Sequence, residues 1–149
     1  MHVVSTCLWR YRKINSANSR VTDCILETYN DSTIHGITLL SEDKKVPYWN
    51  KNLFHSKNII FHKGIKENGD LYELTNIFSF IKDIGKNTCS FITGDGGIDY
   101  SSDYNNQEKN SLKLIYGEIF VALNLQSNEG TFICKIFDIF LKETIYLLY

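Results

Sequence analysis

The chain of 149 residues is 43% hydrophobic and 22% charged, which is ordinary for one folded domain. Its net charge of −1 excludes a general attraction to nucleic acid or anionic membranes, so such contacts would need a local patch. No apolar run could span a bilayer, and residues 1–7 lack the pattern of a signal peptide. The four cysteines and four histidines show no zinc-ligand spacing, so we expect reduced thiols, an intracellular protein and no metal site.

Residues 3–14 carry apolar side chains at helical spacing, and we expect a helix there. Its other faces would present an aromatic ring and three basic side chains, namely Trp9, Arg10, Arg12 and Lys13. Such a surface can grip phosphates and stack on bases, but a solvated helix face explains the same pattern. The polar segment 15–32 that follows is expected to be mainly loop.

Two short apolar runs in the middle of the chain, 34–40 and 58–62, predict strands, with a loop over 46–57 between them. A helix is expected from Leu71 to Gly85, because apolar residues recur three and four positions apart and glycine commonly ends a helix. The stripe comprises Leu71, Leu74, Ile77, Phe78 and Ile81.

The C-terminal half again alternates between strand and helix patterns. We expect strands at 88–93 and 131–137, a long helix over 106–126, a turn at 127–130 and a helical segment over 140–149. The residues of the long helix that face the core are expected to be Leu112, Ile115, Ile119, Ala122 and Leu123, widened by Leu114, Val121 and Leu125. This alternation predicts a doubly wound, parallel α/β sheet.

The strand at 88–93 ends in Gly94-Asp95-Gly96-Gly97, and a polar loop follows it. A β-hairpin is not expected here, because it would need a second strand directly after the turn. A simple Asp-Gly turn without a function is an alternative explanation of the glycines. In open α/β sheets, ligands bind beyond the carboxyl ends of the strands, and glycines let a ligand approach a carboxylate closely. Asp95 is therefore a candidate functional residue.

Lys135 interrupts the apolar run at 132–137, where a buried lysine is disfavoured unless its charge is paired or lost. The alternative is a lysine near the strand end whose amine reaches water. Consecutive parallel strands often pair, so Asp95 and Lys135 would share one crevice. A carboxylate and an amine in one crevice can tune a proton-transfer group.

Asp70 follows Gly69 at the expected start of a helix. Capping of that helix explains an aspartate at this position, and a role in binding is the alternative. The glycines at 94, 96 and 97 do not form a dinucleotide-binding fingerprint, because Asp99 stands where its last glycine would be. A Walker-type phosphate loop is also absent from the sequence.

Three segments together resemble the FtsJ-like 2′-O-ribose methyltransferases, and among them the cap-specific mRNA enzymes of eukaryotes and large DNA viruses. These segments are 91–97, the helix at 108–125 and 130–138, and the pairing of Asp-Gly-Gly with Phe-Ile-Cys-Lys-x-Phe-Asp is specific. The family also fits Leu8-Trp9-Arg10, 36–39, the adenine-contacting turn Gly69-Asp70-Leu71 and the final residues 146–149. The resemblance implies a partial, Rossmann-like methyltransferase domain over residues 1–149.

The family uses S-adenosylmethionine and a Lys-Asp-Lys-Glu tetrad. The resemblance implies that Asp95 is the tetrad Asp and also lies beside the methionine part of the cofactor. Lys135 matches the second tetrad Lys, which takes the proton from the ribose 2′-hydroxyl or steers that hydroxyl in line with the methyl sulfonium. Asp70, with Leu71 beside it, would accept a hydrogen bond from the adenine amino group.

The chain also departs from the family pattern. The glycine-rich cofactor loop and the strand before it, which lies in the middle of the sheet, are expected ahead of Cys7 and are not found there. The first tetrad Lys is expected upstream of Met1, and the tetrad Glu downstream of Tyr149. These departures predict a sheet truncated at both ends, without its first central strand, whose unpaired edges leave little independent stability.

We therefore expect methyl transfer to the ribose 2′-hydroxyl of capped mRNA, with the isolated chain inactive or weakly active. One alternative is a non-catalytic remnant or binding subunit, and another is an unrelated nucleotide-binding protein, against which the absent phosphate loop argues. Expected partners are the capped RNA 5′ end, other capping enzymes or the missing part of the domain, and no membrane. The many Asn, Ile, Lys and Tyr residues fit a large DNA virus or a protist. A viral protein would act in the host cytoplasm and a cellular cap enzyme in the nucleus.

Overall fold

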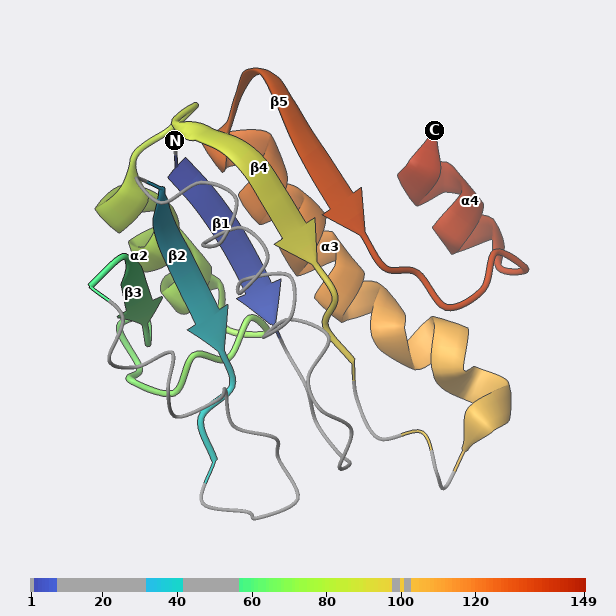
Figure 1. Cartoon of the computed structure of the whole chain (residues 1–149). Helices are drawn as coiled ribbons and strands as arrows, with labels where there is room; N and C mark the ends of the chain where they lie inside the picture. The colour runs from blue at the N-terminus through green and yellow to red at the C-terminus, as the bar shows by residue number, and fades with distance from the viewer. Residues whose placement is uncertain (1, 8–31, 42–56, 98–99, 101–102) are drawn as a thin grey trace.

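A computed structural model describes residues 32–41, 57–97, 100 and 103–149, together with the backbone of residues 2–7 (Figure 1). Five parallel strands form one sheet in the order β3-β2-β1-β4-β5. The strands are β1 (His2–Cys7), β2 (Thr33–Thr38), β3 (Ile59–His62), β4 (Cys89–Gly94) and β5 (Gln126–Cys134). The helices are α2 (Leu74–Ile84), α3 (Gln107–Leu125) and α4 (Lys142–Leu148), with a short 3₁₀ turn, η2 (Tyr104–Asn106), before α3.

Residues 2–7 form a strand, so the helix predicted for 3–14 is wrong in its first half. This strand, β1, pairs with β2 from His2 to Cys7 and with β4 from Val3 to Thr6. The central position of the sheet is therefore filled, and the expectation of a missing first central strand with unpaired edges is also wrong. A short apolar run suits a helix or a strand, and pairing on both sides satisfies the backbone of the strand. Residues 8–14, with the basic and aromatic side chains noted above, lie outside the described residues.

The strand order confirms the parallel, Rossmann-like α/β architecture. The chain runs outward through β1, β2 and β3, and then crosses back to place β4 on the other side of β1. The point at which the order reverses therefore lies between β1 and β4, where doubly wound folds bind ligands. Residues 8–31 and 42–56, which make up most of the connections from β1 to β2 and from β2 to β3, lie outside the described part of the chain.

Helices α2 and α3 lie side by side on one face of the sheet (Figure 1). Between them and the sheet is the apolar core, formed by Ile37, Leu39, Leu71, Ile77, Phe80, Ile81, Cys89, Ile92, Leu114, Val121, Ala122 and Leu125. The α2 helix starts at Leu74, three residues after the predicted start, and Gly85 ends it as expected. Leu74 and Phe78 are exposed, because the stripe that reaches the core is narrower than predicted.

The long helix α3 is present as predicted, and its buried face is largely the predicted one, since Leu114, Ile115, Val121, Ala122 and Leu125 are buried. Leu123, expected in the core, is 75% exposed, whereas Glu118 is 0% exposed. The core face is made by Ser111, Leu114, Ile115, Glu118, Val121, Ala122 and Leu125. Apolar residues lie on several sides of this helix, so its periodicity alone did not fix which side is buried.

The last strand also differs in its ends from the prediction. β5 begins at Gln126, and its register against β4 jumps from Cys89–Gln126 to Phe91–Thr131, so the turn predicted at 127–130 is a bulge within the strand. β5 ends at Cys134, so Lys135 is the first residue after it and not an interior strand residue. The helical segment expected after Phe140 is α4. None of the helices that the structure describes has the length and apolar character needed to cross a membrane.

Candidate active site

The carboxyl ends of the strands meet at one edge of the sheet. Cys7 of β1 pairs with Thr38 of β2, Thr6 pairs with Gly94, and Gly94 in turn pairs with Cys134 of β5. Residues directly after β4 therefore lie beside the end of β1, at the point where the strand order reverses, and residues directly after β5 lie one strand further along the same edge. This is the usual ligand-binding position of an open α/β sheet.

The structure brings Asp95 and Lys135 together at this edge. The Lys135 backbone N–H donates a hydrogen bond to the Gly94 carbonyl at 2.7 Å, which continues the pairing past the end of β5. The Lys135 Nζ then donates to the Asp95 backbone carbonyl at 2.5 Å. Both side chains are half-buried, and the ammonium also lies 5.2 Å from the centre of the Phe137 ring. The lysine amine therefore points toward the turn that contains Asp95, which differs from the alternative of a lysine whose amine simply reaches water.

Glu118 is a third member of this site, and the sequence analysis did not single it out. It projects from α3 toward the turn after β4, where its Oε1 accepts a hydrogen bond from the Gly96 N–H at 2.8 Å. Burial raises the pKa of Glu118 to about 8, and the negative charge of Asp95 adds to this, against the opposing effects of the Gly96 hydrogen bond and the Lys135 charge. A charged residue in register with apolar residues of one helix face is the signal that could have found it.

The raised pKa predicts how stability changes with pH. A Glu carboxyl titrates at 4.5 when unperturbed and at about 8 in this folded chain, so the folded state binds the extra proton between these values. The stability linked to this proton is fully present below the lower value and is lost as the pH rises through about 8. From about pH 5 to about pH 9, we expect the unfolding free energy to fall by on the order of a few kcal/mol relative to Glu118→Gln.

Denaturant unfolding of both proteins across this pH range measures the effect. Glu108→Gln is the matched control, since Glu108 is also a buried carboxyl of α3. Burial raises the pKa of Glu108, but hydrogen bonds, including one from the Leu141 N–H, outweigh this and lower it. The difference in unfolding free energy between Glu108→Gln and the unchanged chain should therefore be constant over the same pH range. An equally constant difference for Glu118→Gln would contradict the prediction.

Asp70 lies in a turn tied to α2 by several hydrogen bonds. Its N–H donates to Asn68 Oδ1 at 3.1 Å, and its Oδ1 accepts from the Tyr72 N–H at 2.9 Å. The buried Asn76 amide donates to Asn68 Oδ1 at 2.7 Å and to the Asp70 carbonyl at 3.0 Å. The residue that caps α2 is Glu73, so the interpretation of Asp70 as the helix cap is wrong. These hydrogen bonds hold Asp70 in a turn that precedes α2 and is separate from its cap.

This turn is seated at the carboxyl end of β2. The Leu40 N–H donates to the Asn68 carbonyl at 2.7 Å, just past the last residue of that strand. Asp70 therefore lies on the β2 side of the end of β1, and Asp95 lies on the β4 side. Leu71, the neighbour of Asp70, is 2% exposed and packs in the core, so it offers a ligand its backbone rather than its side chain.

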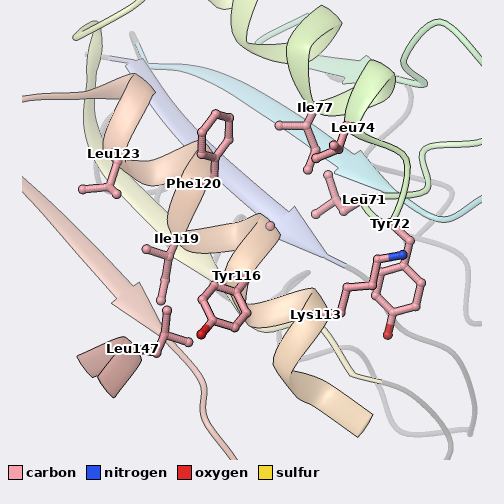
Figure 2. Close-up of a pocket in the computed structure, with 11 residues that line it drawn as sticks. Leu71, Tyr72, Leu74, Ile77, Lys113, Tyr116, Ile119, Phe120, Leu123 and Leu147 are labelled. Carbon is pink, nitrogen blue, oxygen red and sulfur yellow. The ribbon is translucent and has the colours of Figure 1, made fainter. Parts of the chain in front are cut away.

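An apolar pocket of about 520 Å³ opens on the helical face, and Leu71 and Tyr72, which follow Asp70, form part of its lining (Figure 2). Its walls come from α2, α3 and α4 and include Leu74, Ile77, Tyr116, Phe120, Leu123 and Leu147. Asp95, Glu118 and Lys135 do not line it. A cationic ligand would find no carboxylate among its lining residues, so the strand-end site is the better candidate for chemistry.

The strand-end site suits an organic ligand that carries positive charge and amino donors. Two carboxylates, Asp70 and Asp95, flank the end of β1. An amine, Lys135, stands beside the same turn and can hold or take a proton from a hydroxyl. Within the described residues, no group of three or more His, Cys, Asp or Glu side chains is arranged to hold a metal ion.

Known proteins match large parts of this chain in sequence. The profile of a family described as FtsJ-like methyltransferase matches residues 15–148. The cap-specific mRNA (nucleoside-2′-O-)-methyltransferase 1A of Caenorhabditis briggsae is 34% identical over 90 residues, which are 58% of this chain and 10% of that protein. The human cap-specific mRNA (nucleoside-2′-O-)-methyltransferase 1 is 33% identical over 90 residues, which are 58% of this chain and 11% of that protein.

A viral relative aligns over more of the chain. The cap-specific mRNA (nucleoside-2′-O-)-methyltransferase of Autographa californica nuclear polyhedrosis virus is 28% identical over 114 residues, which are 76% of this chain and 42% of the viral protein. The chain thus spans about a tenth of the cellular relatives and less than half of the viral one. Since the family profile covers most of its length, the chain belongs to the FtsJ-like methyltransferase family.

Proposed function

We propose that this chain carries the transfer site of an S-adenosylmethionine-dependent RNA methyltransferase that acts on the ribose 2′-hydroxyl at the capped 5′ end of mRNA. The observation that carries the proposal is the meeting of Asp95 and Lys135 at the carboxyl ends of β4 and β5, next to the reversal point of a sheet in this family. The relatives support the cap-specific substrate, since all three are named cap-specific mRNA (nucleoside-2′-O-)-methyltransferases.

The residues at the strand ends fit the cofactor by their chemistry. S-adenosylmethionine is a sulfonium cation with an ammonium group and an adenine amino group, and when bound it supplies the methyl group. Asp95 would accept the methionine ammonium on the β4 side of the site, and Asp70 would accept the adenine amino group on the β2 side. Leu71 would support the adenine through its backbone, because its side chain is committed to the core.

Lys135 would act on the RNA. Its amine, held at the Asp95 carbonyl, would hydrogen-bond the ribose 2′-hydroxyl and, in its uncharged form, would receive the proton of that hydroxyl as the new bond forms. Much of the rate would come from alignment, because methyl transfer needs the attacking oxygen, the methyl carbon and the sulfur in line. The chain's own residues thus supply orientation, charge balance and a proton acceptor.

The test is transfer of a labelled methyl group to short capped RNA by the full protein that contains these residues. We expect incorporation into RNA whose first transcribed nucleotide has a free 2′-hydroxyl, and none where that position is already methylated. Binding of S-adenosylmethionine without transfer to any RNA would instead support the alternative of a binding subunit. Under the same proposal, the protein would work with other capping enzymes. It would act in the host cytoplasm if the gene is viral and in the nucleus if the gene is cellular.

The role proposed for Asp70 has its own test. Asp70→Asn keeps an oxygen for the Tyr72 N–H but removes the negative charge, so the turn should persist. We expect S-adenosylmethionine to bind about tenfold more weakly, because a hydrogen bond to a charged acceptor is lost or weakened. Calorimetric titration measures this. Asp83→Ala, at the opposite end of α2, should bind like the unchanged chain, and equal affinities for all three proteins would remove Asp70 from the cofactor site.

A further inference from the structure

Glu118 is a buried carboxyl within the core face of α3. Its side chain is 0% exposed, and apolar residues, among them Leu114 and Val121, precede and follow it on that face. A carboxyl at such a position is costly unless its oxygens have polar partners. The partners of Glu118 are therefore informative about why a carboxyl is buried here.

Those partners belong to the turn after β4 and to the end of β5. Oε1 accepts the Gly96 N–H at 2.8 Å, and Oε2 lies 3.9 Å from the Cys134 thiol. A side chain at Gly96 would place its Cβ 2.8 Å from Oε1, and one at Gly94 would place its Cβ 3.0 Å from the carboxyl carbon. The turn thus fits closely over the carboxyl, and it needs glycines to do so.

The Asp95–Gly96 peptide group is held at both of its ends. Its N–H donates to Glu118 Oε1 at 2.8 Å, and its carbonyl accepts the Lys135 Nζ at 2.5 Å. A peptide group is planar, so fixing the direction of the N–H also fixes the direction of the carbonyl. A hydrogen bond at one end also polarises the group and strengthens the bond at the other end. Glu118 and the Lys135 amine are therefore linked through this one peptide group.

The charges around Glu118 are consistent with this arrangement. The groups that face it are Asp95 after β4, with Cys134 and Lys135 at the end of β5. Burial raises the pKa of the Cys134 thiol to about 12, so this neighbour stays uncharged. The raised pKa of Glu118 means that it mostly keeps its proton near neutral pH. The carboxyl thus anchors the turn without adding a second negative charge beside Asp95.

We propose that Glu118 is a positioning residue of the transfer site: it orients the Asp95–Gly96 peptide group and, through the carbonyl of that group, the Lys135 amine. The functional part of this proposal rests on the proposed methyl transfer, whereas the geometric part can be tested without it. Glu118 precedes Lys135 in the chain, whereas the tetrad Glu of the family is expected after it, so this role is distinct from the tetrad.

Three variants separate positioning from general stability. Glu118→Leu removes the acceptor for the Gly96 N–H but keeps the size and the burial of the side chain. Glu118→Gln restores an acceptor oxygen at the same place. Glu108→Leu removes another buried α3 carboxyl, which accepts the Leu141 N–H at 2.9 Å and has no contact with the turn after β4 among the described hydrogen bonds. All three are compared well below their unfolding temperatures.

The first readout is the rate at which acetic anhydride acetylates Lys135, measured by mass spectrometry against the exposed Lys142 as internal standard. We expect Glu118→Leu to raise this rate several-fold, because the amine loses its oriented carbonyl partner, and we expect Glu118→Gln to reverse most of the change. Glu108→Leu should match the unchanged chain. Equal Lys135 rates in Glu118→Leu and Glu108→Leu, or equal rates in Glu118→Leu and Glu118→Gln, would overturn the proposal.

The second readout is methyl transfer to capped RNA. Glu118→Leu should lower kcat by about tenfold, the equivalent of one lost hydrogen bond, with Glu118→Gln recovering most of it. The dissociation constant of S-adenosylmethionine should change less than kcat, because the cofactor contacts are on other groups. If the unchanged protein binds the cofactor and transfers nothing, the proposed function fails, and the acetylation rates still decide whether Glu118 positions Lys135.

Discussion

Replacing Lys135 with methionine is expected to lower the rate of methyl transfer to capped RNA by about 100-fold or more, with little change in cofactor affinity. Methionine has a similar length and keeps the apolar stem, so the loss is confined to the amine and its hydrogen bond to the Asp95 carbonyl. The amine is the group proposed to align the 2′-hydroxyl and to receive its proton, and both effects act on the rate rather than on cofactor binding.

Lys113→Met is the matched control for this experiment. Lys113 is an exposed lysine of α3 whose amine lies 4.7 Å from the centre of the Tyr72 ring, on the helical face of the domain. Its loss should leave the transfer rate within about twofold, because a surface charge of this kind contributes little. Transfer by the Lys135 variant at the rate of the Lys113 variant would remove Lys135 from the reaction, and the assignment of Asp95 as its partner would lose its main support.

The sequence predicted most of the sheet, because four of its strands are marked by local patterns. The runs at 34–40, 58–62, 88–93 and 131–137 are apolar, short and bounded by polar or glycine-rich segments, and each corresponds to a strand. The central strand β1 has no such unique pattern. Its partners, β2 and β4, lie more than twenty residues away in the chain, so only the assembled sheet decides that residues 2–7 are extended.

The candidate site was predictable in part for the same reason. Asp95 follows a strand end that the glycines at 94, 96 and 97 mark in the sequence. Lys135 was found as a lysine that interrupts an apolar run, although the strand ends before it and not at 137 as predicted. Asp70 was located by the resemblance, while its local pattern suggested a helix cap that the structure assigns to Glu73. Glu118 was not singled out, because α3 is apolar on several sides and its buried side depends on how it meets β4 and β5. Tertiary packing, and not periodicity, decides which polar residue of such a helix is buried.

The second large effect is expected at Gly69, where alanine should lower the unfolding free energy by about 3 kcal/mol or more. Gly69 has a φ of +64°, and an added Cβ would lie 1.8 Å from the backbone carbonyl oxygen of Thr38. That oxygen belongs to the last residue of β2 and cannot move without disturbing the sheet. The turn that carries Asp70 would have to lift from β2, so cofactor affinity should fall together with stability.

Gly85→Ala is the control for Gly69→Ala. It carries the cost of a positive φ without the close contact between the added Cβ and a backbone carbonyl. Gly85 has a φ of +93°, but an added Cβ would meet only the Thr88 methyl group at an ordinary distance of 3.7 Å. We expect this variant to lose about 1–2 kcal/mol, which is less than Gly69→Ala loses, because it bears the cost of the φ of +93° and ψ of 145° without a backbone clash. Urea unfolding of both variants measures the difference. Equal losses would mean that the turn at 68–70 does not rest on β2, and Asp70 would then not be held beside the end of β1, where the proposed cofactor site needs it.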